Sequence, residues 1–195
     1  MLKISFHLKP DQHLFVISGP SGVGKDTVIE GLKKVKLRFE WVITTTTRSM
    51  RKGEKDGKPY YFVNRKRFQK LIAEGKMIEF ANVYGNYYGT TWEALESAFQ
   101  KSKLVILKND PQGARTIKAK LPQVVIIFII PSNLETIEKR LRKRGTDSEV
   151  TIQKRIAAVK RDLADLSFAD YEVVNPEGKP ELASQEVFEI IQNVL

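Results

Sequence analysis

The seven residues GPSGVGK, at positions 19–25, decide the fold of this chain. Glycines let successive backbone N–H groups turn inward, and the closing lysine adds a positive charge at the start of a helix. The run HLFVIS at 13–18 is apolar and β-rich, and residues 25–35 carry apolar side chains at helical spacing. A strand, a glycine loop and a helix in this order predict a phosphate-binding loop.

The two residues after the loop lysine bear on metal binding. The strict motif has Ser or Thr directly after the lysine to hold Mg²⁺, whereas here Asp26 stands there and Thr27 follows. Asp26 either holds magnesium through water or is an acid in the first helical turn, where the helix dipole favours a negative charge. First-turn acids are common, which favours the second interpretation. A magnesium ligand at Asp26 or Thr27 stays open.

Composition limits the chemistry that this chain can perform. Its 195 residues are 42% hydrophobic and 29% charged, which is typical of one compact globular domain. The formal net charge of +10 favours anionic partners. There is no cysteine, and the two histidines, His7 and His13, both lie near the start of the chain. The reaction therefore has to use lysine, arginine, carboxylates and hydroxyls.

The sequence shows little sign of a membrane helix or a secretion signal. The longest apolar run, 124–130, is far shorter than the roughly 20 residues of a membrane helix. No run of signal-peptide length precedes Asp11, and a chain without cysteine suits a reducing compartment. We therefore expect a cytoplasmic protein with no membrane partner, while a short organelle-targeting segment stays open.

Strand and helix patterns alternate along most of the chain. Apolar runs predict strands at 40–43, 103–107, 124–130 and 171–174. Helical spacing and end signals predict helices at 112–120, 134–144, 150–166 and 181–194. This alternation predicts an α/β fold, a phosphate-loop parallel sheet with helices on both faces.

The middle third interrupts that alternation. Residues 44–60 are polar and basic, and short strands are expected at 61–63, 77–84 and 87–90 around one helix at 65–73. We interpret this region as an inserted mixed β/α subdomain.

Five motifs together resemble the guanylate kinase family. Besides the glycine loop they are TTRSMRKGEKDG at 46–57, GNYYGT at 85–90, DPQGA at 110–114 and RGTDS at 144–148, in the family order and spacing. Two arginines three apart, with hydroxyls before them and a tyrosine after, suit a phosphate monoester. The resemblance covers about residues 13–192. It implies a single domain whose core is about 1–43, 93–139 and 158–195, with a GMP-binding subdomain at about 44–92 and a helical lid at about 140–157.

The resemblance also implies an acceptor site for GMP. Glu79 aligns with the glutamate that reads guanine, because one carboxylate can accept from the ring N–H and the exocyclic amine together. Adenine offers an acceptor at the first of these positions, so discrimination against AMP should be large. The residues implied to bind GMP are Thr44, Arg48, Arg51, Tyr60, Glu79, Tyr88, Thr90 and Asp110.

A donor site for ATP follows from the same resemblance. The implied ATP-binding residues are Gly19, Pro20, Ser21, Gly22, Val23, Gly24, Lys25, Asp26, Thr27 and Arg140, and the implied catalytic residues are Lys25, Arg48, Arg144 and Arg155. The expected reaction moves the γ-phosphoryl group of Mg-ATP to GMP, with Mg²⁺ as cofactor. The chain departs from the family at Lys108, where an acid is common, and Pro176 stands after Asn175 where an acid is usual near adenine.

Other interpretations stay open. The segment GKDT at 24–27 is also similar to the loop of ribose bisphosphate phosphokinases, which lack the guanine-reading segment. A non-catalytic guanylate-kinase-like module that binds phosphopeptides is a second alternative. Nucleic-acid binding fits the net charge, but the basic residues are scattered and nucleic acid is not expected as a partner. We expect ATP and GMP as partners, and a monomer or homodimer.

Overall fold

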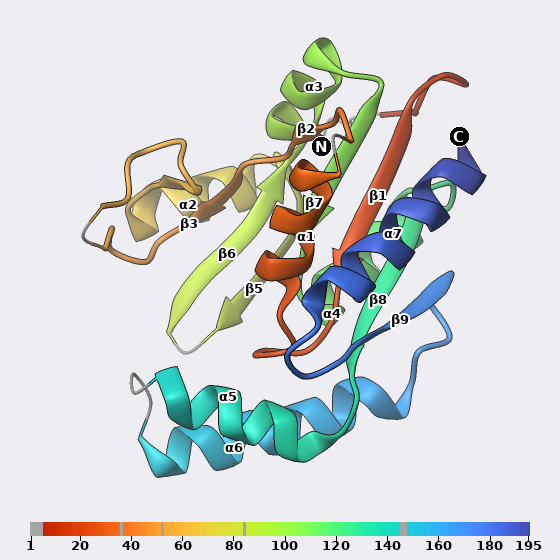
Figure 1. Ribbon diagram of the computed structural model, residues 1–195. Helices are drawn as coiled ribbons and strands as arrows, with labels where there is room; N and C mark the ends of the chain where they lie inside the picture. Colours follow the sequence, from red (N-terminus) through yellow and green to blue (C-terminus); the bar gives the residue numbers. More distant parts are fainter. Residues whose placement is uncertain (1–5, 36, 52, 84, 145–147) are drawn as a thin grey trace. The chain divides into compact units, whose positions relative to one another are not determined.

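The computed structural model describes residues 6–35, 37–51, 53–83, 85–144 and 148–195, without the side chains of residues 143 and 144 (Figure 1). Its strands are β1 (His13–Ser18), β2 (Glu40–Trp41), β3 (Thr44–Thr46), β4 (Tyr60–Phe62), β5 (Met77–Val83), β6 (Asn86–Thr91), β7 (Leu104–Lys108), β8 (Val125–Pro131) and β9 (Tyr171–Asn175). Its helices are α1 (Lys25–Lys34), α2 (Arg65–Ala73), α3 (Trp92–Lys101), α4 (Pro111–Lys120), α5 (Leu134–Arg144), α6 (Glu149–Ala164) and α7 (Pro180–Val194).

The main sheet has five strands in the order β2-β7-β1-β8-β9. The pairs β2/β7, β1/β8 and β8/β9 are parallel, with Ile17 opposite Ile127 and Ile129 opposite Val173. Strands β1, β7 and β8 are rich in Val, Ile and Leu because a parallel sheet covered by helices buries both of its faces. The predicted α/β fold class is confirmed.

Contacts divide the chain into two compact units. Unit 1 comprises residues 1–14, 39–107 and 112–124, and unit 2 comprises residues 15–38, 108–111 and 125–195. Each unit is built from separate stretches of sequence, so partners within a unit are often far apart along the chain.

Unit 2 carries the glycine loop. Its core holds Phe15 and Phe128, which are fully buried, and the parallel strands β1, β8 and β9. Helices α1 and α7 lie side by side, where the buried Ser184 Oγ donates a 3.0 Å hydrogen bond to the carbonyl of Val28 (Figure 1). Helices α5 and α6 also lie side by side. The end of β1, which leads into the loop, is held by its pairing with β8 up to Ser18.

Unit 1 contains a second sheet of four strands in the order β4-β3-β6-β5. Strand β3 pairs parallel with β4 and antiparallel with β6, and β5 pairs antiparallel with β6. A small core beside the sheet holds Phe68, Leu71 and Met77, and the ring of Phe68 stacks on Tyr87 with centroids 5.3 Å apart. This sheet carries most of the residues that were expected to bind GMP.

The sequence-based prediction of elements needs three corrections. The strand expected at 40–43 is only Glu40–Trp41. Residues 44–46 form strand β3 instead of belonging to a loop, because β-branched threonines fit a pleated, half-buried sheet. Helix α3 was not predicted, although Thr91 Oγ1 accepts a hydrogen bond from the Ala94 amide and so caps its start. The other expected elements are present, with ends shifted by one or two residues.

Among the described residues, no helix is long and apolar enough to cross a membrane.

Candidate functional site

The glycine loop of unit 2 ends at an open helix start. Gly24 precedes α1 with φ of 100°, and no side chain caps the first amide groups. A Cβ atom at Gly24 would lie 2.4 Å from Asn175 Nδ2, which is too close for any side chain. Asn175 itself donates a 2.7 Å hydrogen bond to the Val23 carbonyl. The loop is thus held from outside while its amide groups stay available to an anion.

Lys25 folds back onto the loop that precedes it. Its Nζ donates to the carbonyls of Gly19, at 2.5 Å, and Pro20, at 3.0 Å. Burial and, after it, the positive charge of Lys108 lower the pKa of Lys25 to about 8, whereas the negative charge of Asp26 opposes the shift. A cation held in a partly desolvated place is stabilised when an anion arrives.

Two of the three arginines of helices α5 and α6 that were expected at the ATP site contact the loop. Arg140 Nη1 donates to the Val23 carbonyl at 2.8 Å, and Arg155 Nη1 donates to Ser21 Oγ at 3.1 Å. The side chain of Arg144, and residues 145–147 of the expected motif, lie outside the described residues. Arg142, to which we had given no role, joins α5 to α6 by donating to Glu149 Oε1 at 2.8 Å.

A cavity of about 390 Å³ adjoins the loop within unit 2. Its lining includes Thr27 and Asn175, together with Gly22, Gly24, Arg140, Gly178 and Pro180. Asn175 is 1% exposed, and its Oδ1 has no hydrogen-bond partner among the described residues. A buried amide acceptor without a partner costs free energy unless a ligand donates to it. The cavity is therefore polar at the point where Asn175 ends β9.

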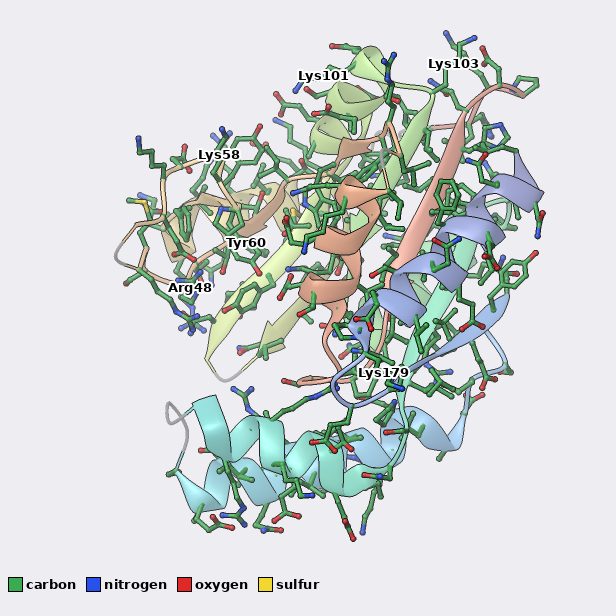
Figure 2. The ribbon with its side chains drawn as sticks, in the orientation of Figure 1. Arg48, Lys58, Tyr60, Lys101, Lys103 and Lys179 are labelled. Atoms are coloured by element: carbon green, nitrogen blue, oxygen red, sulfur yellow. The ribbon has the colours of Figure 1, made fainter. Side chains whose placement is uncertain are left out.

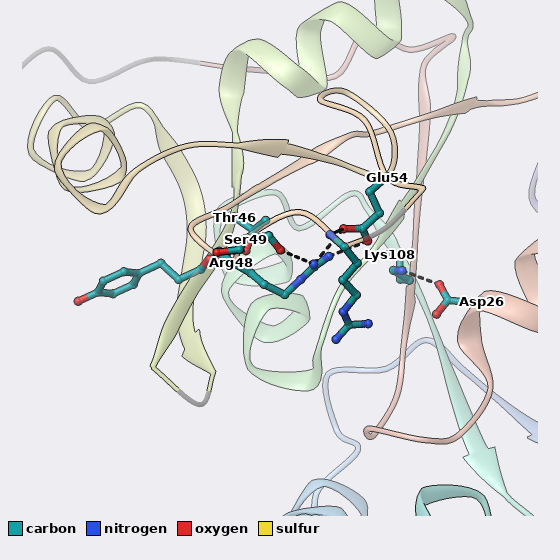
Figure 3. A network of polar contacts seen from close by, with 8 residues as sticks. Asp26, Thr46, Arg48, Ser49, Glu54 and Lys108 are labelled. Atoms are coloured by element: carbon teal, nitrogen blue, oxygen red, sulfur yellow. Dashed lines mark hydrogen bonds and ion pairs between the residues drawn. The ribbon is translucent and has the colours of Figure 1, made fainter. Parts of the chain in front are cut away.

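Unit 1 holds Arg48 in a fixed orientation. Its Nη1 and Nη2 donate to Glu54 Oε2 and Oε1 at 2.9 and 2.8 Å, as the dashed lines of Figure 3 mark. The Arg48 carbon Cζ also lies 5.5 Å from the ring centroid of Tyr60 and 5.4 Å from that of Phe62. The bonds to Glu54 raise the pKa of Arg48 and lower the pKa of Glu54 to about 2. A forked, stacked guanidinium of this kind suits phosphate oxygens.

Other residues that were expected to bind GMP lie around Arg48. Figure 2 shows Arg48 and Tyr60 close together. The rings of Tyr60 and Tyr88 meet edge to face with centroids 5.9 Å apart. Thr44 lies directly opposite Tyr60 in the β3/β4 pair. Arg51 joins the group through its backbone, because its amide donates to Glu54 Oε2 at 2.7 Å while the residue itself is exposed.

Glu79 and Thr90 form a buried pair in the same sheet. They are direct partners in the β5/β6 register, and Thr90 Oγ1 donates to Glu79 Oε1 at 2.6 Å. Glu79 is 4% exposed and Thr90 is fully buried. A buried carboxylate with a neutral hydroxyl beside it is well suited to accept further N–H donors, since a carboxylate has about four acceptor positions.

Asp26 and Lys108 form an ion pair within unit 2. Lys108 Nζ lies 2.5 Å from Asp26 Oδ1 (Figure 3). The described residues contain no group of three or more His, Cys, Asp or Glu side chains that could hold a metal. Side-chain oxygens near the loop include those of Asp26, Thr27 and Asp110. This donor set suits Mg²⁺ that arrives with phosphates, since such an ion takes only one or two protein ligands.

Sequence reasoning missed two residues of these networks. Glu54 stood in the quoted motif without a role, and the pairing of one acid with nearby arginines could have indicated it. Asn175 was considered only for a base, whereas it also binds the loop. No local pattern shows that contact, because Asn175 and Val23 are distant in sequence.

Comparisons with known proteins agree with one another. The sequence profile of the family described as "Guanylate kinase" matches residues 11–193. A guanylate kinase of Carboxydothermus hydrogenoformans is 43% identical over 162 residues, 83% of this chain and 79% of that protein. One of Streptococcus thermophilus is 43% identical over 92% of this chain and 85% of its own length. The crystal structure of guanylate kinase from Anaplasma phagocytophilum has a TM-score of 0.71 at 30% identity and covers 93% of this chain and 85% of its own.

Proposed function

Because the chain belongs to the guanylate kinase family, we propose as its function the transfer of the γ-phosphoryl group of ATP to GMP, giving ADP and GDP. The enzyme is an ATP:GMP phosphotransferase. The observation that carries this assignment is the buried pair of Glu79 and Thr90. A carboxylate there accepts the ring N–H and the exocyclic amine of guanine, and a base without these donors leaves it unpaired.

The GMP phosphate binds at Arg48 in this proposal. Support comes from the fork of Arg48 on Glu54 and from the stacked rings of Tyr60 and Phe62, which fix the guanidinium before a ligand arrives. Tyr88 and Arg51 add a phenol and a second guanidinium, and Thr44 and Asp110 contact the base. A phenol donates to phosphate without adding charge, so product can leave.

The ATP phosphates bind at the loop 19–25. Support comes from the uncapped start of α1 and from the lysine and arginine nitrogens that now bond to loop oxygens. In the complex Lys25, Arg140 and Arg155 exchange these bonds for phosphate oxygens. Asn175 Oδ1 accepts from the adenine amine, since it is a buried acceptor lining the adjoining cavity.

Magnesium enters as the partner of ATP. Asp26 or Thr27 would hold it together with phosphate oxygens and water, in keeping with the oxygen donors present at the loop. When bound, the ion neutralises charge on the β- and γ-phosphates.

The chain's own residues supply alignment and neutralisation of charge. Lys25 and the arginines offset the charge that spreads over the moving phosphoryl group, and Arg48 directs an acceptor oxygen in line with it. Arg144 is proposed to join them as a catalytic residue. Helices α5 and α6 then have to exclude water, because otherwise ATP would be hydrolysed. We propose residues 44–92 as the GMP-binding subdomain and 140–157 as the lid that closes in each turnover.

Cellular context follows from the substrates. We propose a cytoplasmic enzyme of purine nucleotide metabolism, because a chain without cysteine suits a reducing compartment where ATP and GMP occur. A monomer or homodimer is expected, which light scattering of the purified chain would decide.

The deciding experiment measures ADP formation from Mg-ATP with one acceptor at a time. The acceptors are GMP, AMP and ribose 1-phosphate or ribose 1,5-bisphosphate, against a blank without acceptor. Turnover confined to GMP is the expected result. Turnover with a ribose phosphate instead of GMP would favour the phosphokinase alternative, and GMP binding without any turnover would favour the binding module.

A further inference from the structure

Lys108 is the last residue of β7, and its ammonium group meets the carboxylate of Asp26 at 2.5 Å (Figure 3). Asp26 directly follows the loop lysine in the first turn of α1. The strict phosphate-loop motif has a hydroxyl at the position of Asp26, and the family that the chain resembles commonly has an acid at the position of Lys108. Both positions therefore depart from a common pattern, and their side chains contact each other.

The backbone fixes Lys108 beside the loop. The amide of the next residue, Asn109, donates to the Ile17 carbonyl at 3.2 Å, two residues before the loop begins. The Lys108 side chain is only 23% exposed, whereas that of Asp26 is 75% exposed. The Lys108 side chain is therefore the more covered partner of the pair, and the Asp26 side chain is the more exposed one.

The need of Asp26 for a counter-ion does not by itself explain why Lys108 is ordered and partly buried. A first-turn acid is already stabilised by the helix dipole, and an exposed acid gains little from an ion pair. Ordering and partly burying a lysine costs side-chain entropy and hydration.

The placement also brings Lys108 close to another cation. Its charge is the second cause, after burial, of the lowered pKa of Lys25. Two like charges held together in the free protein repel each other, and an anion that binds both relieves the repulsion.

From this geometry we infer that Lys108 is a second phosphate-binding lysine of the donor site, with Asp26 as the residue that positions it. The inference rests on the proposed role of ATP as donor. An ammonium has three donors, so Lys108 can bond to Asp26 and to a phosphate oxygen together. It then supplies part of the charge that a divalent cation otherwise supplies, and the chain retains affinity for ATP when the cation is removed.

The test measures the dissociation constant of ATP by calorimetry in excess EDTA and again with magnesium, on the full chain. The variants are K108A, K108R and, as matched control, K101A, which removes a lysine that is paired with Glu40 at 3.2 Å. In EDTA we expect K108A to bind ATP about 10-fold more weakly than the wild type, and K108R and K101A within about 3-fold of it. With magnesium the K108A loss should shrink.

A second arm separates phosphate binding from a counter-ion role. If Lys108 only balances Asp26, the double variant D26N/K108A binds ATP in EDTA as tightly as the wild type. In our inference the double variant stays weak, because the phosphate contact is gone, while D26N alone binds ATP more weakly than the wild type and more tightly than K108A, because Lys108 is still present but is held less well.

Three results would overturn the inference: wild-type ATP binding by K108A in EDTA, an equal loss in K101A, or recovery in the double variant. Thermal unfolding of each variant without nucleotide shows whether the variant is folded. If K108A does not fold, K108R still tests the site, because it retains the positive charge. The assay contains no GMP. If the chain does not phosphorylate GMP but its binding of ATP depends on Lys108, the proposed function is contradicted and this inference still holds.

Discussion

Thr90 Oγ1 donates a 2.6 Å hydrogen bond to Glu79 Oε1 between directly paired positions of β5 and β6. The bond orients a buried carboxylate that we assign to guanine. Thr90→Val keeps the shape but removes the donor, so we expect kcat/KM for GMP to fall about 5- to 30-fold, in line with one or two kcal/mol for such a bond. Thr90→Ser keeps the hydroxyl and is the control. Equal loss in both variants would show that the methyl group, not the bond, matters.

Removal of the Glu79 charge should have a larger effect. Glu79→Gln replaces one acceptor oxygen by a donor and leaves the guanine N–H or amine without a partner, which predicts a loss of about 10- to 100-fold in kcat/KM for GMP. Glu93→Gln, an exposed acid in the first turn of α3, is the control. Steady-state kinetics with GMP and AMP check the result. A Glu79→Gln enzyme that still prefers GMP as strongly as the wild type would refute the guanine assignment.

Arg48 should not be replaceable by lysine. Arg48→Lys keeps the charge but loses the fork on Glu54 and the stacking on Tyr60, so we expect KM for GMP to rise about 10-fold or more. Arg67→Lys on the exposed part of α2 is the matched control. The KM for ATP should stay unchanged. A parallel rise in both KM values would instead indicate a general disturbance of the protein.

Glu54 predicts a pH dependence of stability. Its pKa in the folded chain is about 2, below the ordinary value of 4.5, because it accepts from Arg48 and from the Arg51 amide. A lowered carboxyl pKa stabilises the fold above pH 4.5, and that contribution is lost as the pH falls toward 2. The difference in unfolding free energy between wild type and Glu54→Gln should therefore shrink from pH 5 to pH 2. Urea unfolding measures it, with Glu186→Gln as a surface control. A constant difference would contradict the lowered pKa.

Close packing of α1 on α7 predicts a specific steric effect. A Cβ atom at Gly31 would lie 2.0 Å from Ser184 Oγ and 2.5 Å from Ser184 Cβ. Gly31→Ala should destabilise the chain by about 1–3 kcal/mol, although alanine is the better helix former. Adding Ser184→Gly should recover part of that loss, because it removes both clashing atoms. Additive losses in the double variant would show that the two helices do not meet there.

The sequence predicted the elements that have one strong local signal. The loop 19–25, the helices α2 and α5 and the strand β8 are defined by glycines, caps and apolar spacing within a dozen residues. Strand β3 was missed because four threonines read equally well as a polar loop, and only pairing with β4 and β6 decides between them. Helix α3 was missed because it follows β6 without a break and its cap is a strand residue, Thr91.

The candidate site also contains residues that the sequence indicated and contacts that it did not. The resemblance to the guanylate kinase family indicated Arg48, Glu79 and Thr90, and the roles assigned to them stay predictions. The pairing of Lys108 with Asp26 joins residues 82 positions apart, and no local pattern encodes it. Glu54 is closer to Arg48 in sequence, but a fork between them depends on the turn of the chain between β3 and β4.

The long-range hydrogen bonds that hold the glycine loop also determine when the loop reaches its folded conformation during synthesis. The loop leaves the ribosome long before the residues that hold it, since Asn175 is 152 residues from Val23 and Ser184 is 156 residues from Val28. A nascent chain therefore carries an unsupported loop until β9 and α7 have been translated. Ribosome-bound fragments that end before β9 lack the support of Asn175, so we expect nucleotide to stabilise the loop fully only after β9 has been translated.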